Sequence, residues 1–175
     1  MAYYAFLIFG IALLAAAIFL FIKMLLKLIR IKKAQKKETA DHPEARKVFT
    51  EKGTVMMDAF IIIAFTFMAI MEYLTQTNTP DQTPDNPGLI LIMCAIVFFY
   101  LAQVIKTIGK GTLILGRHFF MNEDQTYRFR DIRKSEEYRR RIFLHFKDGK
   151  VAELSYIQAE AVEEARKKSG NFKKR

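Results

Sequence analysis

The chain has 175 residues, of which 51% are hydrophobic, and its net charge of +10 comes from 28 Lys and Arg against 18 Asp and Glu. Nearly all long apolar runs precede Lys106, while most of the charge follows Ile22 and lies outside two further apolar runs. That segregation is typical of membrane spans joined to a polar domain. The single cysteine, Cys94, lies within an apolar run, which excludes a disulfide framework and a CxxC metal site and suggests a buried structural thiol.

Three apolar stretches, residues 3–22, 55–74 and 89–105, are each long enough to cross a hydrocarbon core as a helix. We therefore predict three transmembrane helices, the last two forming a hairpin. No basic residue precedes the first stretch, so we expect an uncleaved anchor, with a cleaved signal peptide as the alternative. Small residues at Ala12 and Ala16 allow close helix approach, within the bundle or between protomers as a homo-oligomer.

The distribution of basic residues predicts the orientation, because Lys and Arg resist translocation. Residues 23–53 hold ten of them, residues 75–88 hold none, and the other eighteen lie from Lys106 onward. We expect a multi-pass protein of the cell membrane with its N-terminus outside and its C-terminus in the cytoplasm. The connector 75–88, rich in proline and acidic at Asp81 and Asp85, is expected to be extended.

The basic loop after the first span is predicted to continue the helix, with its cations on one face. Clustered cations beside a span are attracted to anionic headgroups. The residues expected to contact anionic lipid are Lys23, Lys27, Arg30, Lys32, Lys33, Lys36 and Lys37. The alternative is that they only set topology and solvate a stalk. Nucleic-acid binding is not expected, because no aromatic residues are interleaved with the charge.

Two local patterns in this half of the chain predict specific structure. Asp41, Pro43 and Glu44 resemble a helix start, which predicts a second short helix ending at Lys52. Asp58, near the start of the second span, is expected to form an interhelix ion pair with Lys106. Proton coupling through Asp58 and Glu72 is the alternative, although carboxylates at opposite interfaces of the membrane suit it poorly.

After Lys106 the sequence loses helical periodicity and predicts a small α+β domain. Asp148-Gly149 lies between two β-prone runs and favours a tight hairpin turn. A two-residue turn would pair Phe143 with Leu154 but Leu144 with Glu153, so either a bulge shifts the register or both faces are covered. We expect five antiparallel strands, at 112–115, 118–122, 126–132, 140–147 and 150–156, and a closing helix at 158–168.

The chain therefore divides, on sequence, into residues 1–53 (first helix and basic loop), 54–107 (the transmembrane hairpin) and 108–175 (the cytoplasmic domain). Five strands and a C-terminal helix, with the segment 126–132 as one strand, resemble a shortened bacterial pleckstrin-homology-like module. Together with the spans and the segments 53–60 and 110–120, residues 45–168 resemble the YobD-like family of bacterial three-span membrane proteins. That resemblance implies a membrane location and no particular activity.

No catalytic or phosphate-binding motif stands out, and His42, His118 and His145 lack ligand spacing, so we expect neither an enzyme nor a cofactor or metal. The leading hypothesis is a membrane-anchored regulatory or interaction protein. Its cytoplasmic domain would present a basic surface that includes Arg139, Arg140 and Arg141 to a protein partner or to anionic lipid. The alternative is an accessory subunit of a membrane transporter, in which the spans pack against a polytopic partner.

Overall fold

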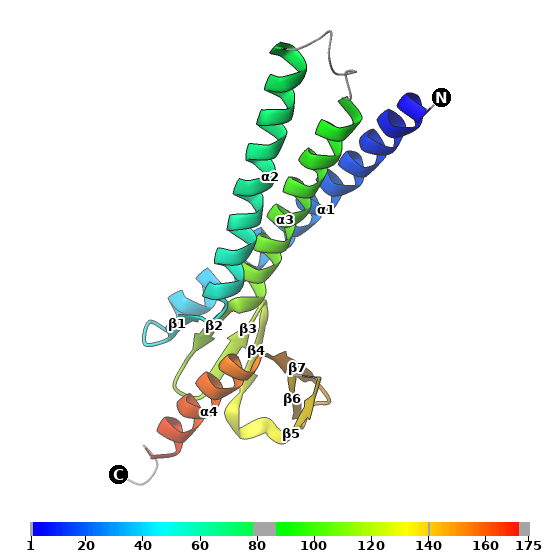
Figure 1. Ribbon diagram of the computed structural model, residues 1–175. Coiled ribbons are helices and arrows are strands. Elements are labelled where there is room, and N and C mark those ends of the chain that lie inside the picture. The colour runs from blue at the N-terminus through cyan, green and yellow to red at the C-terminus, as the bar shows by residue number, and fades with distance from the viewer. Residues whose placement is uncertain (1, 79–86, 140, 172–175) are drawn as a thin grey trace. The chain divides into compact units, whose positions relative to one another are not determined.

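The computed structural model describes residues 2–78, 87–139 and 141–171, apart from the side chains of residues 2, 3 and 171. The chain forms two compact units. The membrane unit comprises Met1–Leu28 and Lys52–Thr107, and the sheet unit comprises Ile29–Glu51 and Ile108–Arg175. Within the described residues these contain three long apolar helices and two antiparallel sheets with a final helix, which confirms the predicted fold class (Figure 1).

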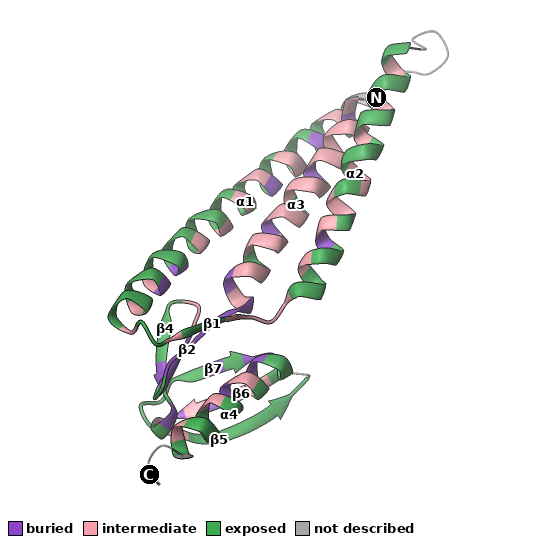
Figure 2. Ribbon diagram, turned by 90° about the vertical axis from the view of Figure 1, so that its left-hand side faces the viewer, coloured by how far each residue is buried: buried purple, intermediate pink, exposed green. Residues whose placement is uncertain are grey.

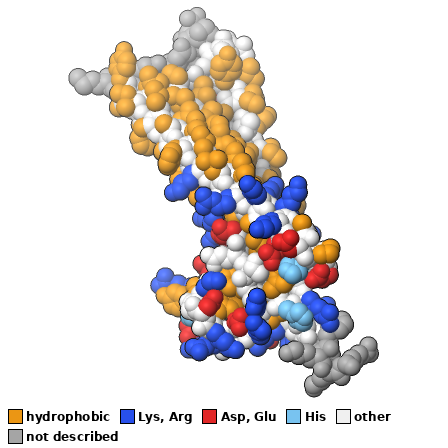
Figure 3. Space-filling model, turned by 180° about the vertical axis from the view of Figure 1, so that it is seen from behind, with side chains coloured by type: hydrophobic (Ala, Val, Ile, Leu, Met, Phe, Trp, Pro, Cys, Tyr) orange, Lys and Arg blue, Asp and Glu red, His pale blue; other side chains and the backbone are white. Residues whose placement is uncertain are grey.

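The long helices are α1 (Ala2–Asp41), α2 (Lys52–Asn78) and α3 (Pro87–Gly111). In the described part of the chain these three are long and apolar enough to cross a membrane. Their apolar side chains cover the surface of the bundle (Figure 3), which is the arrangement that hydrocarbon, and not water, can solvate. The predicted spans are thus confirmed as helices of sufficient length.

Helices α1 and α3 are held together by close approach of small residues. A Cβ atom placed on Gly10 would lie 3.0 Å from the carbonyl oxygen of Gly88, and one on Gly88 would lie 2.9 Å from the backbone of Phe6. One heptad further along each helix, Ala17 and Ala95 are also buried. A seven-residue repeat keeps one seam of two parallel helices in contact.

Helix α2 is far more exposed than α3, which lies between α1 and α2 (Figure 2). Ala12 and Ala16 are both exposed, so they do not form the contact between α1 and α3, which involves Gly10 instead. Close approach of Ala12 and Ala16 between protomers stays a prediction.

The connector between α2 and α3 is shorter than predicted at both ends. Thr75 and Thr77 remain helical, and their hydroxyl groups donate to the carbonyl oxygens of Met71 and Tyr73, at 2.9 and 3.1 Å. At the other end, Pro87 already belongs to α3, where its fixed φ suits a first helical turn. The expected extended conformation was therefore wrong for 75–78 and 87–88, and residues 79–86 lie outside the described residues.

The short helix predicted between Asp41 and Lys52 was wrong. Helix α1 continues to Asp41, and a turn closed by a hydrogen bond from Ala45 N to His42 O (3.0 Å) leads into strand β1, Arg46–Phe49. This strand pairs antiparallel with β2, where Phe49 lies opposite Thr112. Pairing with a strand more than sixty residues away overrides the local helix-start signal.

The sheet unit has two antiparallel sheets among its described residues, with strand orders β1-β2-β3-β4 and β5-β6-β7. The remaining strands are β2 (Thr112–Leu115), β3 (Phe119–Asn122), β4 (Gln125–Arg128), β5 (Ile132–Tyr138), β6 (Arg141–Phe146) and β7 (Val151–Leu154). Predicted strands at 112–115, 118–122, 140–147 and 150–156 are confirmed within a few residues. The described residues hold two strands more than expected, β1 and β5.

The single strand predicted over 126–132 was wrong. A 3₁₀ turn, η1 (Phe129–Asp131), separates β4 from β5, and the chain there passes from one sheet to the other. Burial of both Tyr127 and Phe129 anchors the two sides of this corner. Strand β5 carries four charged residues and little apolar alternation, which is why its pattern did not predict a strand.

The β6–β7 hairpin settles the question of register. Ile142 pairs with Leu154 and Leu144 with Ala152, one residue away from the register of a two-residue turn. The turn has three residues and ends on Gly149 at φ 81°, the left-handed conformation of a bulged hairpin. The bulge brings the apolar side chains of both strands to one face, as the first of the two alternatives required.

Helix α4 (Tyr156–Asn171) closes the unit and starts two residues earlier than predicted. Ser155 and Gln158 form a capping box, with Ser155 N donating to Gln158 Oε1 at 2.9 Å. Gln158 also donates to Lys110 O at 2.6 Å. The helix packs Val162 into a core whose centre is the fully buried Phe120, surrounded by Leu113, Tyr127, Phe129, Leu144, Phe146, Ala152 and Leu154.

Candidate ligand-binding surfaces

All the basic residues of α1 lie between positions 23 and 37 of the helix. Each of the seven is exposed: Lys23, Lys27, Arg30, Lys32, Lys33, Lys36 and Lys37. They follow one another along a continuous helix, so the prediction that this stretch continues the first span is confirmed. Their contact with anionic lipid stays a prediction.

The interhelix ion pair between Asp58 and Lys106 also stays a prediction. Asp58 is 9% exposed, whereas Lys106 is exposed, and the structure records no ion pair between these two described residues. Glu72, on the same helix, accepts a hydrogen bond from Gln76 Nε2 at 2.9 Å. A carboxylate bonded to its own helix is satisfied locally.

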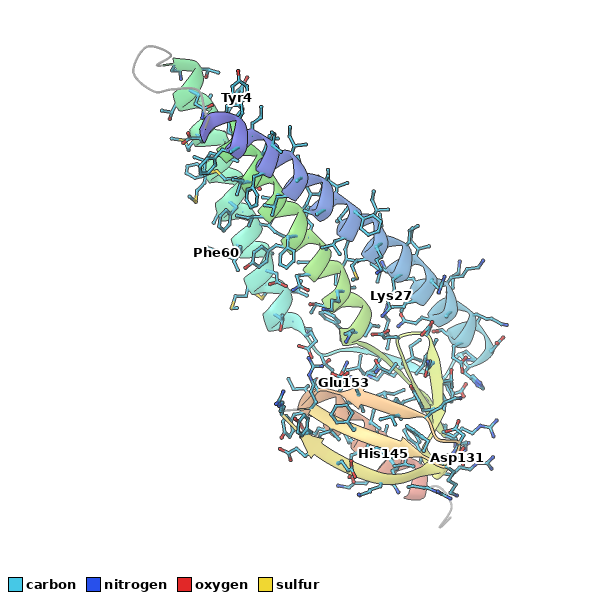
Figure 4. All side chains as sticks on the ribbon, turned by 90° about the vertical axis from the view of Figure 1, so that its right-hand side faces the viewer. Tyr4, Lys27, Phe60, Asp131, His145 and Glu153 are labelled. Atoms are coloured by element: carbon cyan, nitrogen blue, oxygen red, sulfur yellow. The ribbon has the colours of Figure 1, made fainter. Side chains whose placement is uncertain are left out.

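The face of the three-stranded sheet that points away from α4 carries charges of both signs (Figure 4). Arg141 lies 3.3 Å from Glu153, and His145 lies 3.2 Å from Glu136, which also pairs with Lys134. These ion pairs balance the charge of the face.

The pKa of Glu136 is held below its ordinary value, first by the hydrogen bond from Lys134 and then by the charge of that lysine. Opposite charges on neighbouring strands at these distances stabilise the ionised form. Because the carboxylate is exposed, solvent screens its pairing with Lys134, which therefore contributes little to stability.

Only part of the surface predicted at residues 139–141 can be placed. Arg139 has φ 47° at the end of β5, and its guanidinium lies 5.1 Å from the ring centre of Tyr138. Arg141 is committed to Glu153. Arg140 lies outside the described residues. The described members of the group are thus held by an aromatic ring and by a carboxylate, which leaves less free positive charge than the sequence suggested.

A groove of about 700 Å³ lies between strand β5 and helix α4 in the sheet unit. Its floor is apolar, built from Ile132, Ile142 and Leu144 on the sheet and Ala159 and Val162 on the helix. This is the face of the sheet that the bulged hairpin made apolar. Helix α4 packs against this same face of β6 and β7 (Figure 4).

The rim of the groove is charged, and its charges nearly balance. Basic and acidic side chains both line it: Arg133, Lys134, Glu160, Glu163, Glu164, Arg166 and Lys167. At one end, the hydroxyl of Tyr156 donates to Glu137 and joins the helix to the strand. An apolar floor with a rim of both signs is typical of a groove for a peptide segment.

Strand β5 borders this groove as an edge strand. Among the described strands it pairs only with β6, so the backbone groups along its other edge have no strand partner. Charged side chains and the register shift between Ile132 and Lys134 are devices that discourage unspecific pairing at such an edge. The sequence signal could not reveal the groove, since β5 itself was not predicted.

The fold and these surfaces define a class, a helical membrane protein that carries an α+β unit with a grooved, charged surface. No protein-family model matches the chain, and neither a curated protein nor a solved structure matches it.

Proposed function

We propose that the protein is a membrane-anchored interaction module, in which the groove between β5 and α4 binds an extended segment of a partner protein. The observation that carries the proposal is an edge strand of seven residues beside an apolar-floored groove. A segment added to β5 gains backbone hydrogen bonds along the edge, while its alternate side chains enter the groove.

The lining of the groove specifies the chemistry of the partner segment. Every second residue should be apolar, to contact Ile132, Leu144 and Val162 on the floor. The residues between them should be polar or carry both signs of charge, to match a rim that carries Arg133 and Arg166 as well as Glu160 and Glu163. Such a segment is amphipathic with a period of two.

A partner protein suits this groove better than anionic lipid does. The seven charged rim residues comprise four basic and three acidic side chains, so the net attraction for an anionic surface is small. Anionic lipid is instead the ligand we propose for the basic stretch of α1, where no Asp or Glu interrupts the sequence between Lys23 and Lys37.

Two wider assignments belong to the same proposal. The first is the pleckstrin-homology-like resemblance, which we propose from the order of a four-stranded sheet, a three-stranded sheet and a closing helix. The bacterial family named above stays a proposal. The excess of basic residues on both sides of the α2–α3 hairpin supports a cytoplasmic sheet unit in the cell membrane. A reporter fused after Arg175 and active only outside the cell would overturn that orientation.

The test uses the full chain in discs of neutral lipid and a displayed library of ten-residue peptides. We expect the selected peptides to share apolar residues at every second position and to slow hydrogen exchange of the amides in Ile132–Tyr138. Slower exchange is the sign of added backbone hydrogen bonds, which side-chain docking alone does not produce.

Two variants of one helix serve as a matched pair. Ala159 lies in the groove and Ala161 lies outside it, and both are half-buried alanines of α4. Ala159→Arg should weaken peptide binding at least about tenfold, since a charge then meets the apolar side chains of the ligand. Ala161→Arg should leave binding unchanged.

Three results would contradict the proposal. Equal binding by the two variants would place the peptide elsewhere. Slower hydrogen exchange in β7, and not in β5, would show that the peptide pairs with the other edge of the sheet. If β5 is protected from hydrogen exchange without any peptide, and this protection rises with protein concentration, the edge pairs with a second copy of this chain. The transporter-subunit alternative gains no specific support from the described residues, because lipid can cover the exposed face of α2.

A further inference from the structure

One cavity of the sheet unit is lined by basic side chains without acidic ones, unlike the groove between β5 and α4. This cavity, of about 550 Å³, is lined by His118, Arg128, Phe129, Arg130, Arg166, Ser169 and Gly170. Three arginines and a histidine face this space, and none of its described lining residues is acidic. The rim of the groove, by comparison, carries both basic and acidic side chains.

Three separate segments build the cavity. A tight turn, in which Gly116 N donates to Phe119 O at 2.9 Å, places His118 before β3. Arg128 ends β4, and Arg130 lies in η1. Between these two arginines, Phe129 is only 5% exposed, which fixes the backbone that carries both guanidinium groups.

Hydrogen bonds tie these segments together. Phe129 N donates to His118 O at 3.1 Å, and His118 Nδ1 lies 3.1 Å from Ser169 Oγ, near the end of α4. One turn earlier on α4, Arg166 completes the lining. The arginines are therefore brought together by a core residue and by two cross-links between segments.

The guanidinium groups are available for a ligand. Arg130 Nε lies 3.8 Å from Asp131 Oδ1, at a side chain that is 73% exposed. No described residue forms an ion pair with Arg128 or Arg166. Planar guanidinium groups bind phosphate oxygens through paired hydrogen bonds, more strongly than neutral donors do.

We propose that this cavity binds the phosphate monoester group of a small ligand or a lipid headgroup. A monoester carries a charge of about −1.5 to −2, which matches three arginines better than the single charge of a phosphodiester. A cavity of this size also accommodates an organic group attached to the phosphate. The site shares Arg166 with the rim of the groove but is otherwise separate from it.

The experiment titrates the full chain, in discs of neutral lipid, with glycerol 3-phosphate. Arg128→Gln is the test variant because Arg128 does not line the peptide groove. We expect saturable binding by the native chain and about tenfold weaker binding by Arg128→Gln, as lost charged hydrogen bonds imply. Lys147→Gln removes the same charge at an exposed turn outside the cavity and should bind as the native chain does.

Two further arms distinguish the source and the geometry. Vesicles with phosphatidic acid, a monoester, should compete with glycerol 3-phosphate if the ligand is a lipid, whereas vesicles with phosphatidylglycerol, a diester, should not. Arg128→Lys keeps the charge but loses the planar fork, and it should bind more weakly than the native chain.

The proposal is overturned if neither glycerol 3-phosphate nor phosphatidic acid binds, or if Arg128→Gln and Lys147→Gln lose affinity equally. It is also overturned if the diester competes as well as the monoester. Because Arg128 is exposed, its variants should have the same unfolding temperature as the native chain, and thermal unfolding measured in parallel checks this. Peptide binding in the groove is unaffected by Arg128→Gln, so the two proposals fail independently.

Discussion

The membrane unit and the sheet unit bury their residues in opposite ways. In the membrane unit the tightest contacts are made by Gly10 and Gly88, while large apolar side chains such as Phe60 and Phe67 are exposed. In the sheet unit large apolar side chains are buried instead, with Phe120 fully buried and stacked on Tyr127 at 5.2 Å between ring centres. Small residues pack helices where lipid replaces water, whereas apolar area drives packing where water is the solvent.

The largest test of this difference is Phe120→Ala. Removing a fully buried ring leaves a cavity among Tyr127, Phe129 and Phe146, which should lower the free energy of unfolding of the sheet unit by about 3–5 kcal/mol. Urea unfolding of the full chain in uncharged detergent, followed by the near-ultraviolet circular dichroism of tyrosine, measures this change.

The matched control is Phe99→Ala on α3, where the same ring is 44% exposed. This change should leave the urea transition of the sheet unit nearly unchanged, while the tyrosine signal loses only the contribution of the contact between Phe99 and Tyr100. An equal loss of stability in both variants would contradict the contrast between the two units.

The next test enlarges a side chain at a tight contact of the membrane unit. Gly88→Ala adds one methyl group where a Cβ lies 2.9 Å from the backbone of Phe6, so α1 must move away from α3. We expect a loss of about 1–3 kcal/mol, as for overpacking in other tight contacts. Thermal loss of helical circular dichroism in detergent measures it.

Gly53→Ala on α2 is the matched control, because nothing lies within 4 Å of its Cβ position. Alanine also favours helix over glycine, so Gly53→Ala should be neutral or slightly stabilising. If Gly88→Ala were equally harmless, the small-residue seam would not hold the bundle.

The smallest expected effect concerns charge on the outer face of the three-stranded sheet. The folded-state pKa of Glu136 lies below its ordinary value of 4.5, so its pairing stabilises the fold above that pH and is lost as pH falls through the lowered pKa. Lys134→Ala should raise the pKa, which carbon NMR titration of the carboxyl group detects. The pKa of Asp148, lowered by Lys150, should not change.

The sequence predicted the parts of the fold that local chemistry specifies. Long apolar runs located all three long helices, and Asp148-Gly149 located the β6–β7 hairpin. The pattern failed at β1 and β5, where pairing with distant strands decided the conformation against a helix-start signal in one case and a charged composition in the other. These two failures have one physical cause, since strand pairing is non-local.

The candidate sites were hidden for the same reason. The groove needs β5 beside α4, and the arginine cavity joins residues from His118 to Gly170 that share no spacing pattern. Clusters of cations that are adjacent in sequence, as in α1, were visible from the start. Arg128, Arg130 and Arg166 become neighbours only through the corner at η1 and the docking of α4.

The pairing of β1 with β2 has a consequence for biosynthesis. Strand β1 leaves the ribosome before α2 and α3, yet its partner β2 follows them, so about sixty residues must be synthesised in between, which takes several seconds. During that interval the two apolar segments that form α2 and α3 must be delivered to the insertion machinery. If only one of the two spans crossed, β1 and β2 would lie on opposite sides of the membrane, the four-stranded sheet could not form, and β1 would be left as an unpaired strand.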